Sequence, residues 1–282
     1  MGAFTDLSDV INNATGGGAA QPQSSFVLKV GRVASAAAQA PIVGQWTSLW
    51  QYGGVPGVGG SNPGAVAVCD RTTSGAAPLT NPGGSRQLWL TSLAATLTGA
   101  GGLLLYDRLL QIGGLSATTI TDQNVQSGSV VSINRYTTGV GNQIGIEIYT
   151  QIGTTATTIT ASYTNQAGTA GRTTQAVSFG GTNAREAQRV VFLPLADGDT
   201  GVRSVETIRV LASTATAGNF GAFIAHPLRT VSLGFDGSGR EDFLTGTPPP
   251  EEIISGACLA YAVMAASTNA LNGEILAGMQ ER

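Results

Sequence analysis

Apolar residues that alternate with small or polar ones between positions 144 and 210 constrain the fold of this chain more than any other stretch. The alternation is clearest in IGIEI at 144–148 and ITASY at 159–163, and strand-like runs follow at 189–195 and 202–210. Successive strand residues point to opposite faces, so a period of two predicts strands with one buried and one solvated face. Glycine, asparagine and aspartate fill the breaks, as tight turns require. Strands joined by such short loops are antiparallel, which predicts an antiparallel β-sandwich.

The rest of the chain fits the same fold class. Further strands are predicted at 26–33, 65–69, 118–133 (with a bulge), 230–235 and 253–265, and 204–213 is expected to pair with 219–227. The run LLLYDRLLQI at 103–112 reads as a core strand, although a helix would also place Leu104, Asp107, Arg108 and Gln111 on one face. About ten to twelve short strands with regular turns predict an all-β, antiparallel sandwich, most simply of jelly-roll type.

The composition favours a folded protein that is covered within an assembly. Charged residues are 11% of the chain, hydrophobic residues are 42% and the net charge is −3, a combination that disordered chains do not show. A surface this poor in charge promotes association. The basic residues are scattered along an acidic chain, so no nucleic-acid-binding surface is predicted.

The sequence predicts no export signal and no membrane segment. The first residues include Asp6 and Asp9 and carry no basic cluster, unlike a secretory signal. The longest apolar run, 257–266, is too short to cross a bilayer. We therefore expect a protein that is made in a cytoplasm and that acts there or leaves by another route, such as lysis.

The N-terminal part is predicted to be an arm, at 1–25, ahead of a β-sandwich domain at 26–282. Residues 3–15 fit a short helix, and the glycine-rich run at 16–25 reads as a flexible tether.

One face of this helix would be apolar, because Leu7, Val10 and Ile11 fall on the same side. A helix this short is marginal alone and must dock on something. Its partner is either its own domain or a neighbouring subunit, and both readings stay open.

Two tryptophans, two cysteines and three long loops are the other features that stand out. Trp46 and Trp50 share a face on either a strand or a helix, where they would bind a partner, bind a sugar or pack in the core. Long Gly/Pro-rich loops are predicted at 53–64, 71–85 and 236–250, and loops of this length are often functional. Cys69 and Cys258 are expected to be two buried free thiols, with a disulfide as the alternative.

No motif predicts catalysis or a cofactor. His226, the only histidine, has no serine or cysteine at motif spacing, although a catalytic triad is defined by geometry and not by order. Asp197 and Asp199 are the best calcium candidates, but the rest of a calcium loop is missing and DGDTG is also ordinary hairpin sequence. Asp107 and Arg108 read as salt-linked surface groups, with assembly contacts as the alternative. We predict no catalytic residue, no metal and no cofactor.

Several segments resemble a family of virion structural proteins encoded by tailed bacteriophages. They are FTDL at 4–7 leading to ATGG at 14–17, LYDRLL at 105–110 with GGLS at 113–116, ASYTNQAGTAGRT at 161–173, GDTGVRSV at 198–205 and TAGNFG at 216–221. The likeness covers most of the chain, and Tyr163 to Thr173 is its most specific part. The resemblance supplies no catalytic residues and implies a component of a virus particle.

The resemblance leads to one main expectation and two alternatives. The main expectation is a capsid decoration (cement) protein, a homotrimer on the head of the virion, with the major capsid protein and itself as partners and no nucleic acid or membrane. The residues predicted to contact partners are Phe4, Leu7, Val10, Ile11, Trp46 and Trp50. One alternative is a tail, baseplate or fibre component that binds host glycans. The other is a particle-associated hydrolase, which would need a catalytic pair that the sequence does not reveal.

Overall fold

The chain folds into antiparallel β-structure throughout the part that the structure describes. The computed structural model describes residues 22–30, 41–61, 65–126, 131–182, 184–243, 249–268 and 271–281. Within these ranges there are eighteen strands and no helix, and every pairing between strands is antiparallel. The predicted all-β, antiparallel class is therefore confirmed.

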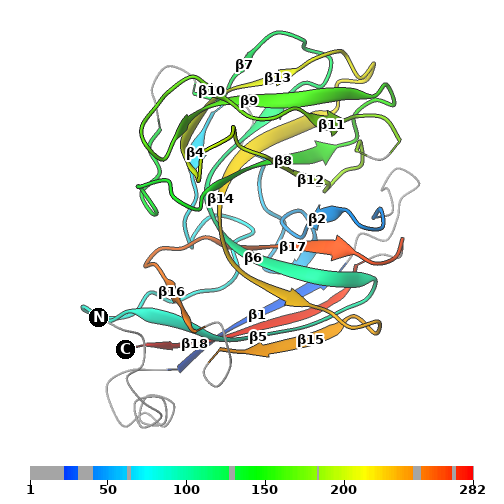
Figure 1. Cartoon of the computed structure of the whole chain (residues 1–282). Coiled ribbons are helices and arrows are strands. Elements are labelled where there is room, and N and C mark those ends of the chain that lie inside the picture. The colour runs from blue at the N-terminus through cyan, green and yellow to red at the C-terminus, as the bar shows by residue number, and fades with distance from the viewer. Residues whose placement is uncertain are drawn as a thin grey trace.

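The strands form three sheets, which lie one above another in Figure 1. The lower sheet has the order β15 (Ser238–Asp242), β5 (Leu88–Leu97), β18 (Gly273–Glu281), β1 (Pro22–Val30) and β3 (Gly53–Val55), with β16 (Glu251–Ile253) also on β5. The central sheet has the order β12 (Val190–Leu193), β8 (Gln143–Thr150), β14 (Asn219–Ser232), β6 (Ala100–Leu115), β17 (Leu259–Ala265) and β2 (Trp46–Ser48), with β4 (Ala67–Val68) also on β6. The upper sheet has the order β10 (Arg172–Thr173), β9 (Thr157–Asn165), β13 (Val202–Val210) and β7 (Gln123–Asn124), with β11 (Val177–Phe179) also on β9.

The central sheet closes on itself into a small barrel. A β-bridge between Thr47 and Arg189 joins its edges at β2 and β12, and the Ser48 amide donates to the Gln188 carbonyl at 2.8 Å. Figure 1 shows β8 and β12 above, β6 and β17 below, and β14 curving from the upper to the lower part. Small barrels are filled by their own side chains. The interior here is a buried cluster of Trp50, Cys69, Ala76, Leu104, Tyr106, Val190, Phe223, Ala225, Cys258, Ala260 and Ala262.

Two further cores lie outside the barrel, each between the barrel wall and one of the flanking sheets. The lower core packs Leu88, Leu90 and Leu93 of β5 and Ile275 of β18 against Leu103 and Leu105 of β6. The upper core packs Ile159, Ala161 and Tyr163 of β9 and Val205 and Ile208 of β13 against Ile144, Ile146 and Ile148 of β8. The barrel wall thus supplies one side of each core, through the long strands β6 and β14.

A bulge changes which residues of β6 face outwards along its length. Ala225 of β14 pairs with Arg108 of β6, whereas the preceding Ile224 pairs with Leu110, so Leu109 is an extra residue on β6. An extra residue reverses which positions face which side of a sheet. Odd-numbered Leu105 therefore faces the lower core and even-numbered Ile112 faces the upper one.

The structure corrects the predicted grouping of strands around 144–210. β8 and β12 belong to the barrel, whereas β9 and β13 belong to the upper sheet. The four strands do not form one sheet; they face each other across the upper core. The predicted pair 204–213 and 219–227 is split in the same way, between β13 and β14. The short loops connect layers, because each strand has an apolar side to bury against the opposite sheet.

The predicted solvated face of 144–148 is also wrong. Gly145 and Glu147 face the barrel interior, and a Cβ at Gly145 would lie 2.1 Å from the Phe223 ring. Glycine at this position makes room for the aromatic ring. The alternation is therefore between two buried sides, one apolar and one that holds rings and charges.

Several element boundaries differ from the predictions. β1 begins at Pro22, inside the predicted tether 16–25, because Pro22 and the next residues pair with β18. The 103–112 run is strand and not helix, and only Gln123–Asn124 of the predicted strand 118–133 is strand among the residues described there. β14 continues through Pro227, where a register shift accommodates the missing amide.

Two predicted segments near the C-terminus have different secondary structure from that expected. The predicted strand 253–265 is two strands, β16 and β17, and the predicted loop 236–250 contains β15.

Candidate functional site

The barrel interior holds a charged pair in the middle of the molecule. The Arg108 Nη2 atom of β6 donates to Glu147 Oε2 of β8 at 2.7 Å, and both side chains are fully buried. The same guanidinium donates to Gln111 Oε1 at 2.8 Å and to the Tyr149 hydroxyl at 3.2 Å. The Leu109 bulge places Arg108 and Gln111 on the same side of β6, although they are three residues apart.

Aromatic rings complete the surroundings of this guanidinium. The Arg108 Cζ atom lies 4.6 Å from the centre of the Trp50 ring and 4.3 Å from that of Phe223. A guanidinium between two aromatic faces gains cation–π attraction that is strongest away from water. The interpretation of Arg108 as a surface group is therefore wrong: it is the charged centre of the barrel.

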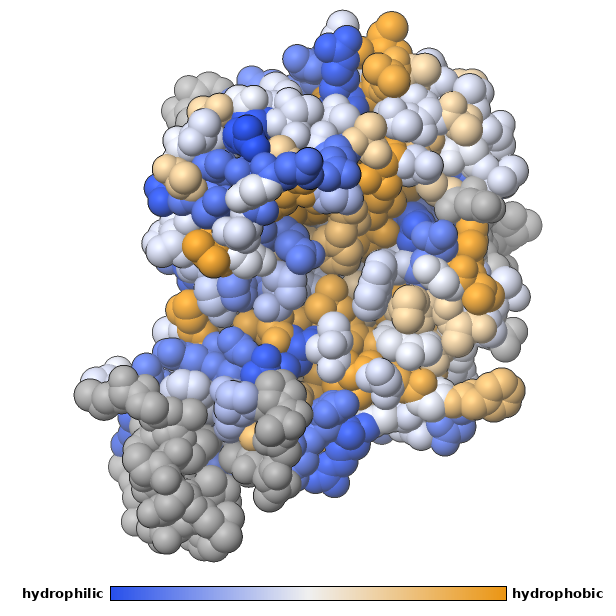
Figure 2. Space-filling view, in the orientation of Figure 1, coloured by the Kyte–Doolittle hydropathy of each residue, from blue (hydrophilic) through white to orange (hydrophobic). Residues whose placement is uncertain are grey.

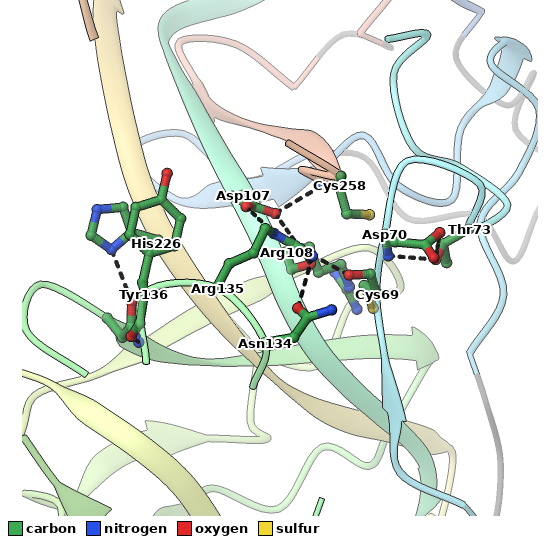
Figure 3. A network of polar contacts seen from close by, with 12 residues as sticks. Cys69, Asp70, Thr73, Asp107, Arg108, Asn134, Arg135, Tyr136, His226 and Cys258 are labelled. Carbon is green, nitrogen blue, oxygen red and sulfur yellow. Dashed lines mark hydrogen bonds and ion pairs between the residues drawn. The ribbon is translucent and has the colours of Figure 1, made fainter. Parts of the chain in front are cut away.

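Asp107 points to the other side of β6 and forms a second buried pair. The Arg135 Nε and Nη2 atoms donate to the two Asp107 carboxylate oxygens at 2.7 and 2.8 Å, as Figure 3 shows. Burial raises the pKa of the Asp107 carboxyl, and the hydrogen bonds from Arg135 oppose that rise. Asp107 is fully buried, so its interpretation as a surface group is also wrong.

This second pair binds the ends of two strands that meet on one edge of β6. The Cys69 amide, just after β4, donates to the Leu109 carbonyl at 3.0 Å, and the Arg108 amide donates to the Cys258 carbonyl, just before β17, at 2.8 Å. Arg135 Nη2 donates to the Cys69 carbonyl and Asp107 accepts from the Cys258 amide, each at 2.8 Å. A continuous strand would join these two backbone groups in one peptide bond. The ion pair satisfies both of them at the break, which we name the β4–β17 seam.

His226 lies in a structural setting and not in a triad. Its Nδ1 atom is 2.8 Å from Asn142 Oδ1, and its ring stacks on Tyr136 with centroids 3.6 Å apart. The side-chain Nδ2 of Asn142 donates to the carbonyls of Tyr136 and Val202. The Asn142 Oδ1 atom therefore accepts the hydrogen bond from His226, whose Nδ1 carries the proton. Burial lowers the pKa of His226 to about 4.

The low pKa of His226 predicts a loss of stability in mild acid. An unfolded histidine has a pKa of about 6.5, so between pH 6.5 and 4 the unfolded chain takes up a proton that the folded chain does not. The contribution of neutral His226 to the free energy of unfolding is fully present above pH 6.5 and is lost as the pH falls towards 4. We expect this residue to account for about 1–2 kcal/mol of that fall, since solvent screens a half-buried ring. Urea unfolding of wild type and His226→Phe at pH 7 and pH 4.5 measures it; an equal fall in both proteins would contradict the assignment.

Asp199 is a structural acceptor in the described structure. Its carboxylate accepts from Tyr163 Oη at 2.6 Å, Asn165 Nδ2 at 2.7 Å and Arg172 Nε at 2.9 Å. The Tyr163 and Arg172 hydrogen bonds lower the pKa of Asp199 to about 2. Asp197 accepts separately, from Gln175 Nε2 at 3.2 Å. No group of three or more potential metal ligands occurs among the described residues.

These contacts predict that calcium has no effect on the folded protein. Addition of calcium or of EDTA is expected to leave the melting temperature unchanged, because three protein donors already occupy the Asp199 carboxylate. Differential scanning fluorimetry tests this. A calcium-dependent rise in melting temperature that disappears in Asp199→Asn would restore the calcium hypothesis.

The residues predicted to contact partners are placed unequally by the structure. Phe4, Leu7, Val10 and Ile11 lie outside the described residues. Trp46 begins β2 and is half-buried. Trp46 packs against the buried cluster of the barrel, and the role of these five residues in contacts with partners stays a prediction.

Trp50 packs inside the chain. It is 1% exposed, and its indole Nε1 donates to the Gly60 carbonyl at 3.0 Å. Gly59 and Gly75 lie against the ring, where a Cβ would come within 2.2 and 3.2 Å of it. Trp50 therefore has the core role that was one reading of its sequence, and it holds the loops around positions 59 and 75 over the barrel.

The outer face of the lower sheet carries an exposed apolar pair. Phe26 of β1 and Leu276 of β18 are directly opposite each other in the register and are 44% and 46% exposed. A shallow groove runs beside them, lined also by Ala94, Thr96, Arg240 and Glu274. Figure 2 shows that apolar and hydrophilic side chains are interleaved over another face of the molecule, with apolar atoms gathered at its middle. Sequence reasoning did not single out Phe26 or Leu276; their cross-strand pairing is invisible until the register is known.

No helix in the described part of the chain is long and apolar enough to cross a membrane.

Comparison with known proteins gives only weak structural similarities. No protein-family model matches the chain, and no curated protein is similar to it. Among solved structures, the VP2 subviral particle of infectious bursal disease virus is similar with 12% identity and a TM-score of 0.19, over 93% of this chain and 79% of that one. The VP1 protein of trichodysplasia spinulosa-associated polyomavirus, in complex with 3'-sialyllactose, is similar with 7% identity and a TM-score of 0.11, over 92% and 95%. TM-scores this low establish neither a common topology nor a common function.

Proposed function

We propose that this chain is a non-enzymatic structural protein of a phage particle, a decoration protein that reinforces the head lattice. The observation that carries the proposal is the resemblance of the sequence to virion structural proteins, strongest between Tyr163 and Thr173. In the fold this segment has a structural use: Asn165 Oδ1 accepts from the Ala167 and Thr169 amides, and Tyr163, Asn165 and Arg172 bind Asp199. The most specific residues thus build a hydrogen-bonded turn and hold the Asp199 loop, a structural use that is consistent with the proposal.

The distribution of charge supports the same proposal. Both buried ion pairs and the Asp199 contacts use charged residues within the fold, in a chain with only 11% of them. These contacts take six of the 31 charged residues, so a surface already poor in charge loses a little more, which favours a protein that is covered by neighbours. The exposed pair Phe26 and Leu276 lies on the lower sheet, and Phe26 directly follows the predicted arm in the sequence. A lattice that the arm grips would lie nearest to this sheet.

The proposal includes three expectations from the sequence: a fold of jelly-roll type, a homotrimer and contact with the major capsid protein. A decoration protein acts by adding interface area between capsid subunits, and about 1,600 Å² of buried surface is enough for specific association.

The copy number of the protein in purified virions tests the proposal. We expect quantitative mass spectrometry to give a ratio to the major capsid protein near one, or a simple fraction that fits one trimer at each local three-fold site. A ratio of a few per cent or less would contradict a head location and favour a tail, baseplate or fibre component. Absence from washed virions would contradict a structural role in the particle altogether.

A further inference from the structure

The β4–β17 seam brings the only two cysteines of the chain together. Cys69 and Cys258 are 189 positions apart in the sequence, but they bond to the neighbouring β6 residues Leu109 and Arg108. Consecutive positions on a strand are about 3.3 Å apart along it, so the backbones of the two cysteines lie side by side at the break.

Both thiols point to the same side of this seam. They belong to the buried cluster inside the barrel, they are fully buried, and each thiol shifts the pKa of the other. Both are free in the structure, as the sequence reading predicted. Figure 3 shows both cysteines near Arg108 and the Asp107–Arg135 ion pair.

We propose that Cys69 and Cys258 are a modification site: they form an intramolecular disulfide when the folded protein passes from a reducing to an oxidising medium. The bond would join β4 to β17 covalently, at a break that the Asp107–Arg135 pair and a hydrogen bond from the Arg71 amide to the Gly256 carbonyl now span. This inference concerns the fold alone and stands whether or not the protein decorates a capsid.

The reaction requires a low-molecular-weight disulfide as oxidant, for example glutathione disulfide. The Cys69 thiolate attacks one sulfur of the oxidant and releases one glutathione thiolate; the Cys258 thiolate then attacks Cys69 and releases the second. Two electrons pass from the cysteine pair to the oxidant, and the two cysteine protons leave on the released thiols. Cys69 is the better first nucleophile, because the Cys258 hydrogen bond lowers its pKa and the guanidinium groups of Arg108 and Arg135 add to this effect.

Access to the buried thiols sets the rate of this reaction. β4 contains only two residues, and its pairing with β6 is limited to Ala67 and Val68. Brief opening of this short strand would expose Cys69 while the rest of the barrel stays paired. We therefore expect slow oxidation of the native protein that accelerates in a low concentration of urea.

The test is oxidation of the full-length folded protein with glutathione disulfide. We expect the intact mass to fall by the mass of two hydrogen atoms, the free thiols counted after denaturation to fall from two to none, and the urea midpoint to rise. Dithiothreitol should reverse all three changes. Persistent free thiols, disulfide-linked dimers or a lower urea midpoint in the oxidised protein would each overturn the proposal.

Single variants separate the internal bond from simple adduct formation. Cys69→Ser and Cys258→Ser each keep one thiol, so we expect a glutathione adduct on it and no rise in the urea midpoint. Accumulation of the same adduct on wild type, without closure, would count against the internal bond. If either variant fails to fold, wild type with and without dithiothreitol still decides the question.

Discussion

Replacement of Glu147 by leucine is expected to destabilise the protein by about 3–5 kcal/mol. Glu147 is the anionic partner of Arg108 in the barrel, and both side chains are fully buried. Its removal would leave a guanidinium out of water without a counter-charge, a cost far larger than that of a lost surface contact. Equilibrium unfolding in urea, followed by tryptophan fluorescence, measures the change directly because Trp50 lies against the guanidinium.

Two matched variants show whether the cost comes from the unpaired charge. The double variant Arg108→Met with Glu147→Leu removes both charges and is expected to recover most of the lost stability, since apolar side chains replace buried pairs well. Asp122→Ala is the exposed control: it breaks the ion pair between Asp122 and Arg209, two side chains that are each 56% exposed. It should change the free energy of unfolding by less than about 0.5 kcal/mol. A double variant as unstable as Glu147→Leu alone would contradict this account of the barrel.

Removal of residues 1–21 is expected to abolish binding to the virus particle and to leave the β-structure intact. The arm is the predicted capsid contact through Phe4, Leu7, Val10 and Ile11. The cut belongs before Pro22, because Pro22 already pairs with Gln280 of β18. Co-sedimentation with particles that lack the protein measures binding, and circular dichroism with thermal melting checks the fold.

A substitution variant controls for the loss of length in this truncation. Serine at positions 7, 10 and 11 keeps the arm but removes its apolar face, and the same loss of binding is expected. Truncated protein that sediments with particles as wild type does would rule out the arm as the main contact. The interface would then be sought at Phe26 and Leu276, the exposed pair on the lower sheet.

The period of two in the sequence was sufficient to predict strands but not the faces that they bury. Runs such as 144–148 and 159–163 became β8 and β9 with nearly the predicted bounds. Their alternation could not tell a solvated face from a barrel interior, because Gly145 and Glu147 suit either environment by composition. Closure of the barrel depends on the bridge from Thr47 to Arg189, a contact between residues 142 positions apart that leaves no local signature.

One signal for the buried charges was present in the sequence. Asp107 and Arg108 are adjacent in LLLYDRLLQI, with apolar residues on both sides. In a strand, adjacent residues point to opposite faces, so two neighbouring charges within an apolar run imply a buried charge on each face, and buried charges need partners. The partners themselves, Glu147 and Arg135, could not be identified, because they come from a different strand and from a loop.

The strands that cross both cores also limit how such a protein can be divided or extended. β6 and β14 each contribute to the lower core, the barrel and the upper core, so no single cut of the chain yields two pieces that each retain a complete interior. A functional chimera with a related protein would therefore have to exchange nearly the whole β-domain, and a split version would have to reassemble from two incomplete parts. Inserted sequence is best accommodated at outward turns, such as the exposed one at Gly84 between β4 and β5, where no wall is interrupted.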